Sequence, residues 1–159
     1  MLRYSFPLNF SRRASVQSAI KALGFGLIVL AGAAFAADAT DPTVKARQQL
    51  MDTIALNTKV LGDMAQGKAA FDTDAAATAR SNLAAAAADI PVKFQEQATD
   101  PATKAGPQIW TNWDTFLQDA EALTKAAEAM NVSDVEGIAA TMGSVGGVCG
   151  DCHKAFRSQ

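Results

Sequence analysis

The feature that most constrains this chain is a five-residue motif near its C-terminus, Cys149-Gly150-Asp151-Cys152-His153. It holds the only two cysteines and the only histidine of 159 residues. The spacing C-x-x-C-H is the attachment signature of a c-type haem, in which each cysteine forms a thioether and the histidine can ligate the iron. On a helix the three side chains share one face, because Cys149 and His153 differ by only about 40° in direction. We therefore predict one covalently attached haem c per chain.

The motif has other readings. A structural zinc site needs four protein ligands, so two thiolates and one imidazole would have to be completed by a carboxylate. A thioredoxin-like redox pair needs C-x-x-C beside a βαβ pattern, which the sequence lacks. A disulfide between Cys149 and Cys152 leaves His153 unexplained. A non-haem exported zinc or thiol protein stays as the third candidate function.

The first 36 residues have the pattern of a secretory signal peptide. Four basic residues form a charged n-region, residues 23–35 form an apolar run, and Ala34-Phe35-Ala36 matches an A-x-A cleavage site. Thirteen apolar residues are too few to span a bilayer, which needs about 20. We expect cleavage after Ala36, with an uncleaved anchor as the alternative, and a single mature domain over residues 37–159.

The expected mature chain is acidic. All 16 acidic residues but only 10 of the 14 basic ones follow Ala36, which gives a formal net charge of −6. The absence of a basic cluster argues against nucleic acid as a partner, while an acidic surface permits a basic redox partner. The one histidine is committed to iron and no carboxylate pair stands out, so we expect that the protein is not an enzyme.

Apolar residues at helical spacing dominate the mature chain, with clear punctuation between segments. The first helix should begin with Asp41 as N-cap and Pro42 as its first residue, and end near Gly67. The second should begin near Asp72 or Thr73 and stop or kink at Pro91.

The second half of the chain follows the same pattern. Residues 98–107 are expected to form a loop, because they hold two prolines and a glycine. A third helix should begin around Thr111 or Asn112, and a capping box of Ser133 and Glu136 should open the fourth. Four helices of about 18–26 residues with short links indicate an all-α, antiparallel up-down-up-down four-helix bundle.

The fourth helix carries an unusual number of glycines, each about 0.8–1 kcal/mol less favourable in a helix than alanine. They are Gly137, Gly143, Gly146, Gly147 and Gly150. Either this helix is weak or broken, or the glycines form a face against which a macrocycle or another helix can lie close to the backbone. We adopt the second interpretation and expect the chain to fold poorly without haem.

The chain resembles the class II c-type cytochromes, that is, cytochrome c′ and its low-spin, methionine-ligated relatives of the c-556 type. The resemblance spans the mature region, and its most specific part is the C-x-x-C-H at the C-terminal end. Supporting segments are residues 47–51, 90–94, 107–110, 142–146 and 152–157. The resemblance implies a four-helix bundle with haem near one end, exported to the periplasm.

The resemblance also implies roles for individual residues. Cys149 and Cys152 would hold the haem, and His153 would be the proximal iron ligand. Arg47 matches a first-helix arginine that lies near a haem propionate, and Arg157 matches an arginine close to the ligating histidine.

Met51 matches the first-helix position that faces the open side of the iron. In low-spin relatives a methionine there ligates the iron, and a thioether ligand favours Fe(II) and raises the potential. We therefore expect an electron carrier with unidentified redox partners. The alternative is a five-coordinate, c′-type protein that binds NO or CO while Met51 only shields the iron. Met64 and Met142 are weaker candidate ligands, and the alanine face at residues 84–88 leaves a homodimer open.

Overall fold

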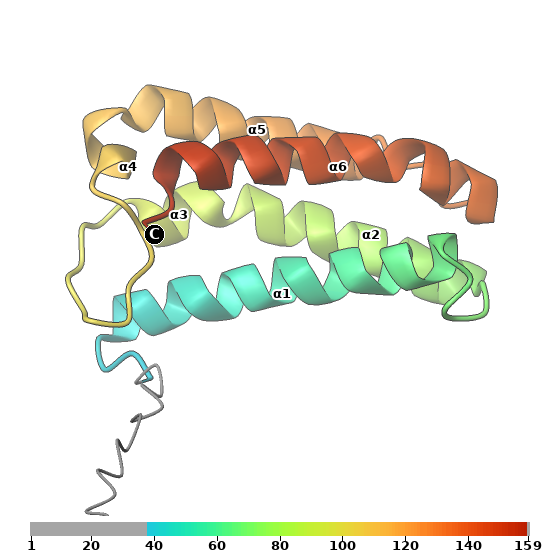
Figure 1. Ribbon diagram of the computed structural model, residues 1–159, viewed down its shortest axis with the longest axis horizontal. Helices are drawn as coiled ribbons and strands as arrows, with labels where there is room; N and C mark the ends of the chain where they lie inside the picture. The colour runs from blue at the N-terminus through green and yellow to red at the C-terminus, as the bar shows by residue number, and fades with distance from the viewer. Residues whose placement is uncertain (1–37, 159) are drawn as a thin grey trace, which may run out of the picture. The chain divides into compact units, whose positions relative to one another are not determined.

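A computed structural model describes residues 38–158, so the expected signal peptide lies outside the described residues. This part of the chain forms α1 (Pro42–Ala65), α2 (Thr73–Ala88), α3 (Ile90–Phe94), α4 (Gln108–Thr111), α5 (Trp113–Glu128) and α6 (Val135–Phe156). Four of these are long, and α1 packs on α2, α2 on α5, α5 on α6 and α6 on α1 (Figure 1). The predicted all-α four-helix bundle is confirmed. None of the described helices is both long and apolar enough to cross a membrane.

Aspartate side chains fix the starts of α1 and α2, as the sequence predicts. The Asp41 carboxylate accepts hydrogen bonds from the amides of Thr43 and Val44, at 2.8 and 3.0 Å. The Asp72 carboxylate accepts one from the amide of Ala75 at 2.7 Å. Both satisfy amide groups that the first helical turn leaves free.

The predicted capping box at the start of α6 is wrong. Asp134, rather than Ser133, is the N-cap, and its carboxylate accepts a hydrogen bond of 2.7 Å from the amide of Gly137. The aspartate competes with the serine one residue earlier and supplies a charged acceptor near the positive end of the helix. Glu136 remains in the first turn without a partner role in the cap.

The structure shows which of the two outcomes expected at Pro91 occurs. Asp89 keeps right-handed helical angles and Pro91 is the second residue of α3, so the proline marks a kink between two helices. The short helix α4 was not predicted. Because residues 89–94 and 108–111 form separate turns, α2 and α5 have 16 residues each, fewer than expected.

The predicted loop after α3 ties one end of the bundle together. The Asp100 carboxylate accepts hydrogen bonds from the amide and hydroxyl of Thr40, at 2.8 and 2.9 Å, and from the amide of Asp41 at 2.9 Å. Further along, the Gly106 amide donates to the Phe156 carbonyl at 2.8 Å. The start of α1, this loop and the end of α6 therefore meet at one end of the bundle (Figure 1).

The alanine run at residues 84–88 divides between core and surface. Ala86 and Ala87 are buried, whereas Ala85 and Ala88 are exposed. Part of this run thus packs within the chain.

Candidate haem site

A cavity of about 990 Å³ lies between α1, α5 and α6. This volume is at the upper end of the range of about 300–1,000 Å³ for cofactor and ligand sites. All six residues proposed from the sequence line it: Arg47, Met51, Cys149, Cys152, His153 and Arg157. The fold therefore brings together residues that are more than 100 positions apart in the chain.

The three motif residues lie on one face of α6 and meet the cavity. Cys149 and Cys152 are half-buried free thiols. Burial raises the pKa of Cys149, and burial with the nearby charge of Asp119 raises the pKa of Cys152 to about 11. Burial, helped by the charge of Arg157, lowers the pKa of His153. Its imidazole is therefore neutral at pH 7, which is the form that ligates metal.

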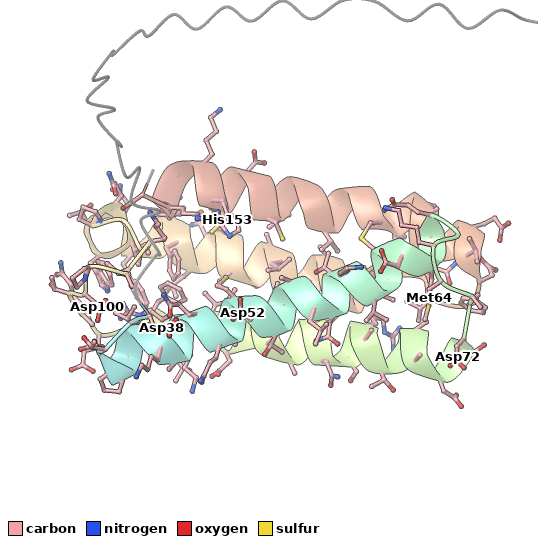
Figure 2. All side chains as sticks on the ribbon, turned by 60° about the horizontal axis from the view of Figure 1, so that its bottom comes forward. Asp38, Asp52, Met64, Asp72, Asp100 and His153 are labelled. Atoms are coloured by element: carbon pink, nitrogen blue, oxygen red, sulfur yellow. The ribbon has the colours of Figure 1, made fainter. Side chains whose placement is uncertain are left out.

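The register between α1 and α6 places Met51 level with His153. The two helices are antiparallel (Figure 1). Gly62 of α1 lies beside Met142 of α6, because a Cβ placed at Gly62 would be 4.0 Å from Cε of Met142. Met51 precedes Gly62 by 11 residues, and His153 follows Met142 by 11 residues. Both steps correspond to about 16.5 Å along a helix. Figure 2 shows His153 and Asp52, the neighbour of Met51, near the same end of the bundle.

Met64 and Met142, the two weaker candidate iron ligands, lie in less suitable positions than Met51. Met64 is buried in the core, near the opposite end of the bundle from His153 (Figure 2). Met142 lines the cavity but belongs to α6, the helix that also carries His153. If His153 held a haem iron, a second protein ligand would have to come from a different helix, and Met51 lines the cavity from α1.

Arg47 is a buried cation with one unpaired nitrogen. Its side chain is 3 % exposed. Nε donates a hydrogen bond of 2.9 Å to the Lys93 carbonyl, and Nη2 donates to the Glu96 carbonyl. Nη1 is buried and has no partner among the described residues. Burial lowers the pKa of Arg47, opposed by the charges of Asp41 and Glu96.

An unpaired buried donor is costly, and more so on a charged group. Arg47 lines the cavity, so a carboxylate held there would satisfy Nη1. A haem carries two such groups in its propionates. The orphaned nitrogen of Arg47 is therefore an observation that fits haem and does not fit an empty apolar cavity.

Gly146 supplies a second sign of fit. It lines the cavity, and a Cβ at this position would meet nothing within 4 Å. The flat face of a macrocycle can thus approach the backbone of α6 at this position. Since α6 is continuous from Val135 to Phe156, the glycines do not break the helix.

Arg157 lies at the rim of the cavity as the exposed residue that follows α6. Its amide donates to the His153 carbonyl at 3.0 Å, and it forms an isolated bridge with Ala105.

The hypothesis of a zinc site finds no support in residues 38–158. Within this range no group of three or more histidine, cysteine, aspartate or glutamate side chains could hold a metal ion.

The surroundings of Arg47 were not predicted. Its Cζ lies 5.1 Å from the ring centroid of Phe94 and 5.3 Å from that of Trp110. These two rings come from α3 and α4, and both belong to segments that carried the family resemblance. The sequences of these two segments do not indicate that their aromatic rings pack against Arg47.

Comparison with known proteins settles the family. The cytochrome c′ family model matches residues 42–157. The chain belongs to the cytochrome c′ family. The cytochrome c-556 of Agrobacterium tumefaciens is 33 % identical over 118 residues, covering 72 % of this chain and 94 % of that protein. In Cereibacter sphaeroides, cytochrome c-554 is 31 % identical over 147 residues (87 % and 95 %), and cytochrome c′ is 32 % identical over 138 residues (82 % and 92 %).

Solved structures of the family share the fold. The cytochrome c556 of R. palustris has a TM-score of 0.66 at 28 % identity, covering 74 % of this chain and 97 % of that one. A cytochrome c′ from Rhodobacter Spheriodes has a TM-score of 0.65 at 28 % identity, covering 74 % and 95 %. Membership of this family confirms the prediction of covalent haem c, and the two cysteines of the chain allow one haem.

Proposed function

We propose that the mature protein is a periplasmic electron carrier and not an enzyme. Haem supplies one-electron chemistry between Fe(III) and Fe(II). In this proposal Cys149 and Cys152 form the thioethers, His153 is the proximal ligand, Met51 is the sixth ligand, Arg47 binds a propionate, and Arg157 lies beside the proximal histidine.

The observation that carries the proposal is the equal register of Met51 and His153 on facing helices. Both helices exceed 20 residues and belong to the bundle, so their side chains are held on rigid elements. Two protein ligands held in this way would leave little to rearrange during electron transfer. The neutral thioether of Met51 favours Fe(II) and raises the midpoint potential.

The Met51→Ala variant tests the assignment. The unmodified protein should have a low-spin spectrum with a weak sulfur-to-iron charge-transfer band in the ferric state. In Met51→Ala the band should vanish, the iron should become high-spin, the potential should fall and CO should bind Fe(II) faster. Met64→Ala is the matched control, because Met64 does not line the cavity, and it should keep the band. An unmodified protein that is already high-spin and five-coordinate would refute Met51 ligation.

The second candidate function is binding of NO or CO at a vacant sixth site. The observation in its favour is that the relatives divide between cytochromes c-556 or c-554 and a cytochrome c′ at similar identities, 31–33 %. Met51 is half-buried, so it could shield the iron and be displaced by a diatomic gas. The spin state of the unmodified protein separates the two functions.

We also propose that cleavage after Ala36 releases the domain over residues 37–159, as the pattern of small residues after the apolar run favours. The intact mass of haem-loaded protein from a periplasmic extract tests this. A mature chain that begins at Ala37 supports the proposal, and a chain that retains residues 23–35 in a membrane fraction contradicts it. The acidic surface of the mature chain favours a basic redox partner.

A further inference from the structure

We propose that Trp110 is a positioning residue for Arg47, and that through Arg47 it raises the midpoint potential of the haem. The inference rests on the proposed function, because it assumes that a haem occupies the cavity. It concerns a residue that does not line the cavity and acts only through the guanidinium.

The first support is the packing of the two flat groups. The Arg47 guanidinium carbon lies 5.3 Å from the ring centroid of Trp110 and 5.1 Å from that of Phe94. Both distances are within the range of about 6 Å for attraction between a cation and an aromatic face, which is strongest for tryptophan. At 3 % exposure the guanidinium has little contact with water, so its ring contacts matter more than they would at a surface.

The second support is a hydrogen bond that fixes the acceptors of Arg47. The indole Nε1 of Trp110 donates to the Phe94 carbonyl at 2.9 Å. Phe94 lies between Lys93 and Glu96, whose carbonyls accept from Nε and Nη2 of Arg47. Trp110 therefore acts on Arg47 in two ways. Its ring packs against one face of the guanidinium, and its indole N–H fixes the backbone segment whose carbonyls accept hydrogen bonds from Arg47.

This arrangement leaves Nη1 as the one guanidinium nitrogen without a partner among the described residues. With the other two nitrogens bonded to carbonyls, the guanidinium is held in one orientation beside the cavity that Arg47 lines. If the ring of Trp110 is lost, Arg47 is free to turn toward Asp41 and Glu96, whose charges already act on it.

The position of this charge bears on the iron. Negative charge near a haem stabilises Fe(III), and a buried cation that neutralises it favours Fe(II) and raises the potential. Arg47 held toward the cavity gives the higher potential, and Arg47 displaced or removed gives the lower one. Trp110 should thus affect the potential only while Arg47 is present.

Trp113 provides a matched control. It has the same side chain three residues away, but it stacks on Phe116, with centroids 5.4 Å apart and planes at 26°. The aromatic partners found for the Arg47 guanidinium among the described residues are Phe94 and Trp110, not Trp113. Both tryptophans are half-buried, but only Trp110 is found against the Arg47 guanidinium.

The experiment is a double-mutant cycle on the haem-loaded protein, read as the midpoint potential by spectroelectrochemistry. Arg47→Leu should lower the potential, and Trp110→Leu should lower it by part of that amount. The double variant Arg47→Leu/Trp110→Leu should match Arg47→Leu alone, and Trp113→Leu should keep the potential of the unmodified protein. Trp110→Phe retains a ring but no indole N–H, and it should lie between the unmodified protein and Trp110→Leu.

Each other result overturns the inference. An unchanged potential in Trp110→Leu, or an equal shift with and without Arg47, shows that Trp110 does not act through the guanidinium. If Trp110→Leu fails to fold, Trp110→Phe decides alone, and a potential equal to that of Trp113→Leu refutes the proposal. A second readout is hydrogen exchange at the Arg47 Nε–H, which should be faster in both Trp110 variants. A protein without a reversible haem couple would instead refute the proposed function.

Discussion

Alanine at two exposed glycines of α6 should stabilise this protein. A Cβ at Gly143 or Gly147 would meet nothing within 4 Å among the described residues, so alanine carries no steric cost there. In a helix interior each glycine is about 0.8–1 kcal/mol less favourable than alanine. The double variant Gly143→Ala/Gly147→Ala should therefore gain about 1.6–2 kcal/mol in the free energy of unfolding.

Two other glycines of the same helix should respond differently. A Cβ at Gly137 would lie 2.5 Å from Nδ2 and 2.6 Å from Cγ of Asn131, so Gly137→Ala should destabilise, and Asn131→Ala in the same chain should restore part of the loss. Gly146→Ala should increase the helix content of the haem-free chain but destabilise the haem-loaded protein, because its Cβ enters the cavity.

Urea unfolding followed by far-ultraviolet circular dichroism measures these changes in the haem-loaded protein, and the ellipticity at 222 nm of the Cys149→Ala/Cys152→Ala chain measures helix content without haem. Glycine-to-alanine substitution in α6 is thus expected to stabilise the protein at Gly143 and Gly147 and to destabilise it at Gly137. At Gly146 it should increase helix content without haem and lower stability with haem. No gain in the Gly143→Ala/Gly147→Ala variant would refute the reasoning, because it would mean that this face of α6 is covered in solution.

Two further predictions concern attachment and pH. Haem should stay with the unmodified polypeptide in denaturing electrophoresis. In the Cys149→Ala/Cys152→Ala variant the haem should be lost or extracted by acid–acetone. Extractable haem in the unmodified protein would contradict thioether attachment. Backbone hydrogen bonds from Asp41, Ala102 and Thr40 lower the pKa of Asp100, so its ionised form stabilises the fold above its unfolded pKa of about 3.9, and that contribution is lost as the pH falls below it. Asp100→Asn should therefore be less stable than the unmodified protein at pH 7, with a difference in urea midpoint that narrows below about pH 4; a difference that stays constant down to pH 3 would show that the charge of Asp100 does not matter.

The parts of the fold that could be predicted depend on short stretches of sequence. The N-caps Asp41 and Asp72 are specified by the residues that immediately follow them, and the haem motif occupies five positions. At the start of α6 two acceptors, Ser133 and Asp134, are adjacent, and a local pattern does not decide between them. At Pro91 the local sequence is also ambiguous. A proline can end a helix, but it is equally tolerated in the first turn of the next one.

The contacts that tune the site could not be predicted, because they join residues far apart in the chain. Arg47 bonds to carbonyls 46 and 49 residues away, and Trp110 flanks it from a helix of four residues. The sequence of that helix has no periodicity to reveal a partner. The resemblance to a family supplied Arg47 and Met51 as candidates, and the structure adds the side chains that hold Arg47 in place.

The register that sets Met51 level with His153 leads to a last prediction. A slip of one helical turn would bring Ala55 to the level of His153, and the next methionine of α1, Met64, is 13 residues from Met51, so Met51 ligation requires this register. Asp100 holds the start of α1, and the same loop holds the end of α6 through Gly106 and Phe156.

Because one loop fixes both helix ends, Asp100→Asn should raise the high-spin fraction of the ferric iron while leaving the thioethers and His153 intact. Visible absorption at pH 7 measures that fraction, and Asp72→Asn, a change of the same kind at the far end of α1 and α2, should leave it unchanged. Asp72 caps α2 and has no hydrogen bond to the loop among those found in residues 38–158. If a folded Asp100→Asn protein keeps the spin state of the unmodified one, the haem ligands alone hold α1 in register, and the loop contributes only stability.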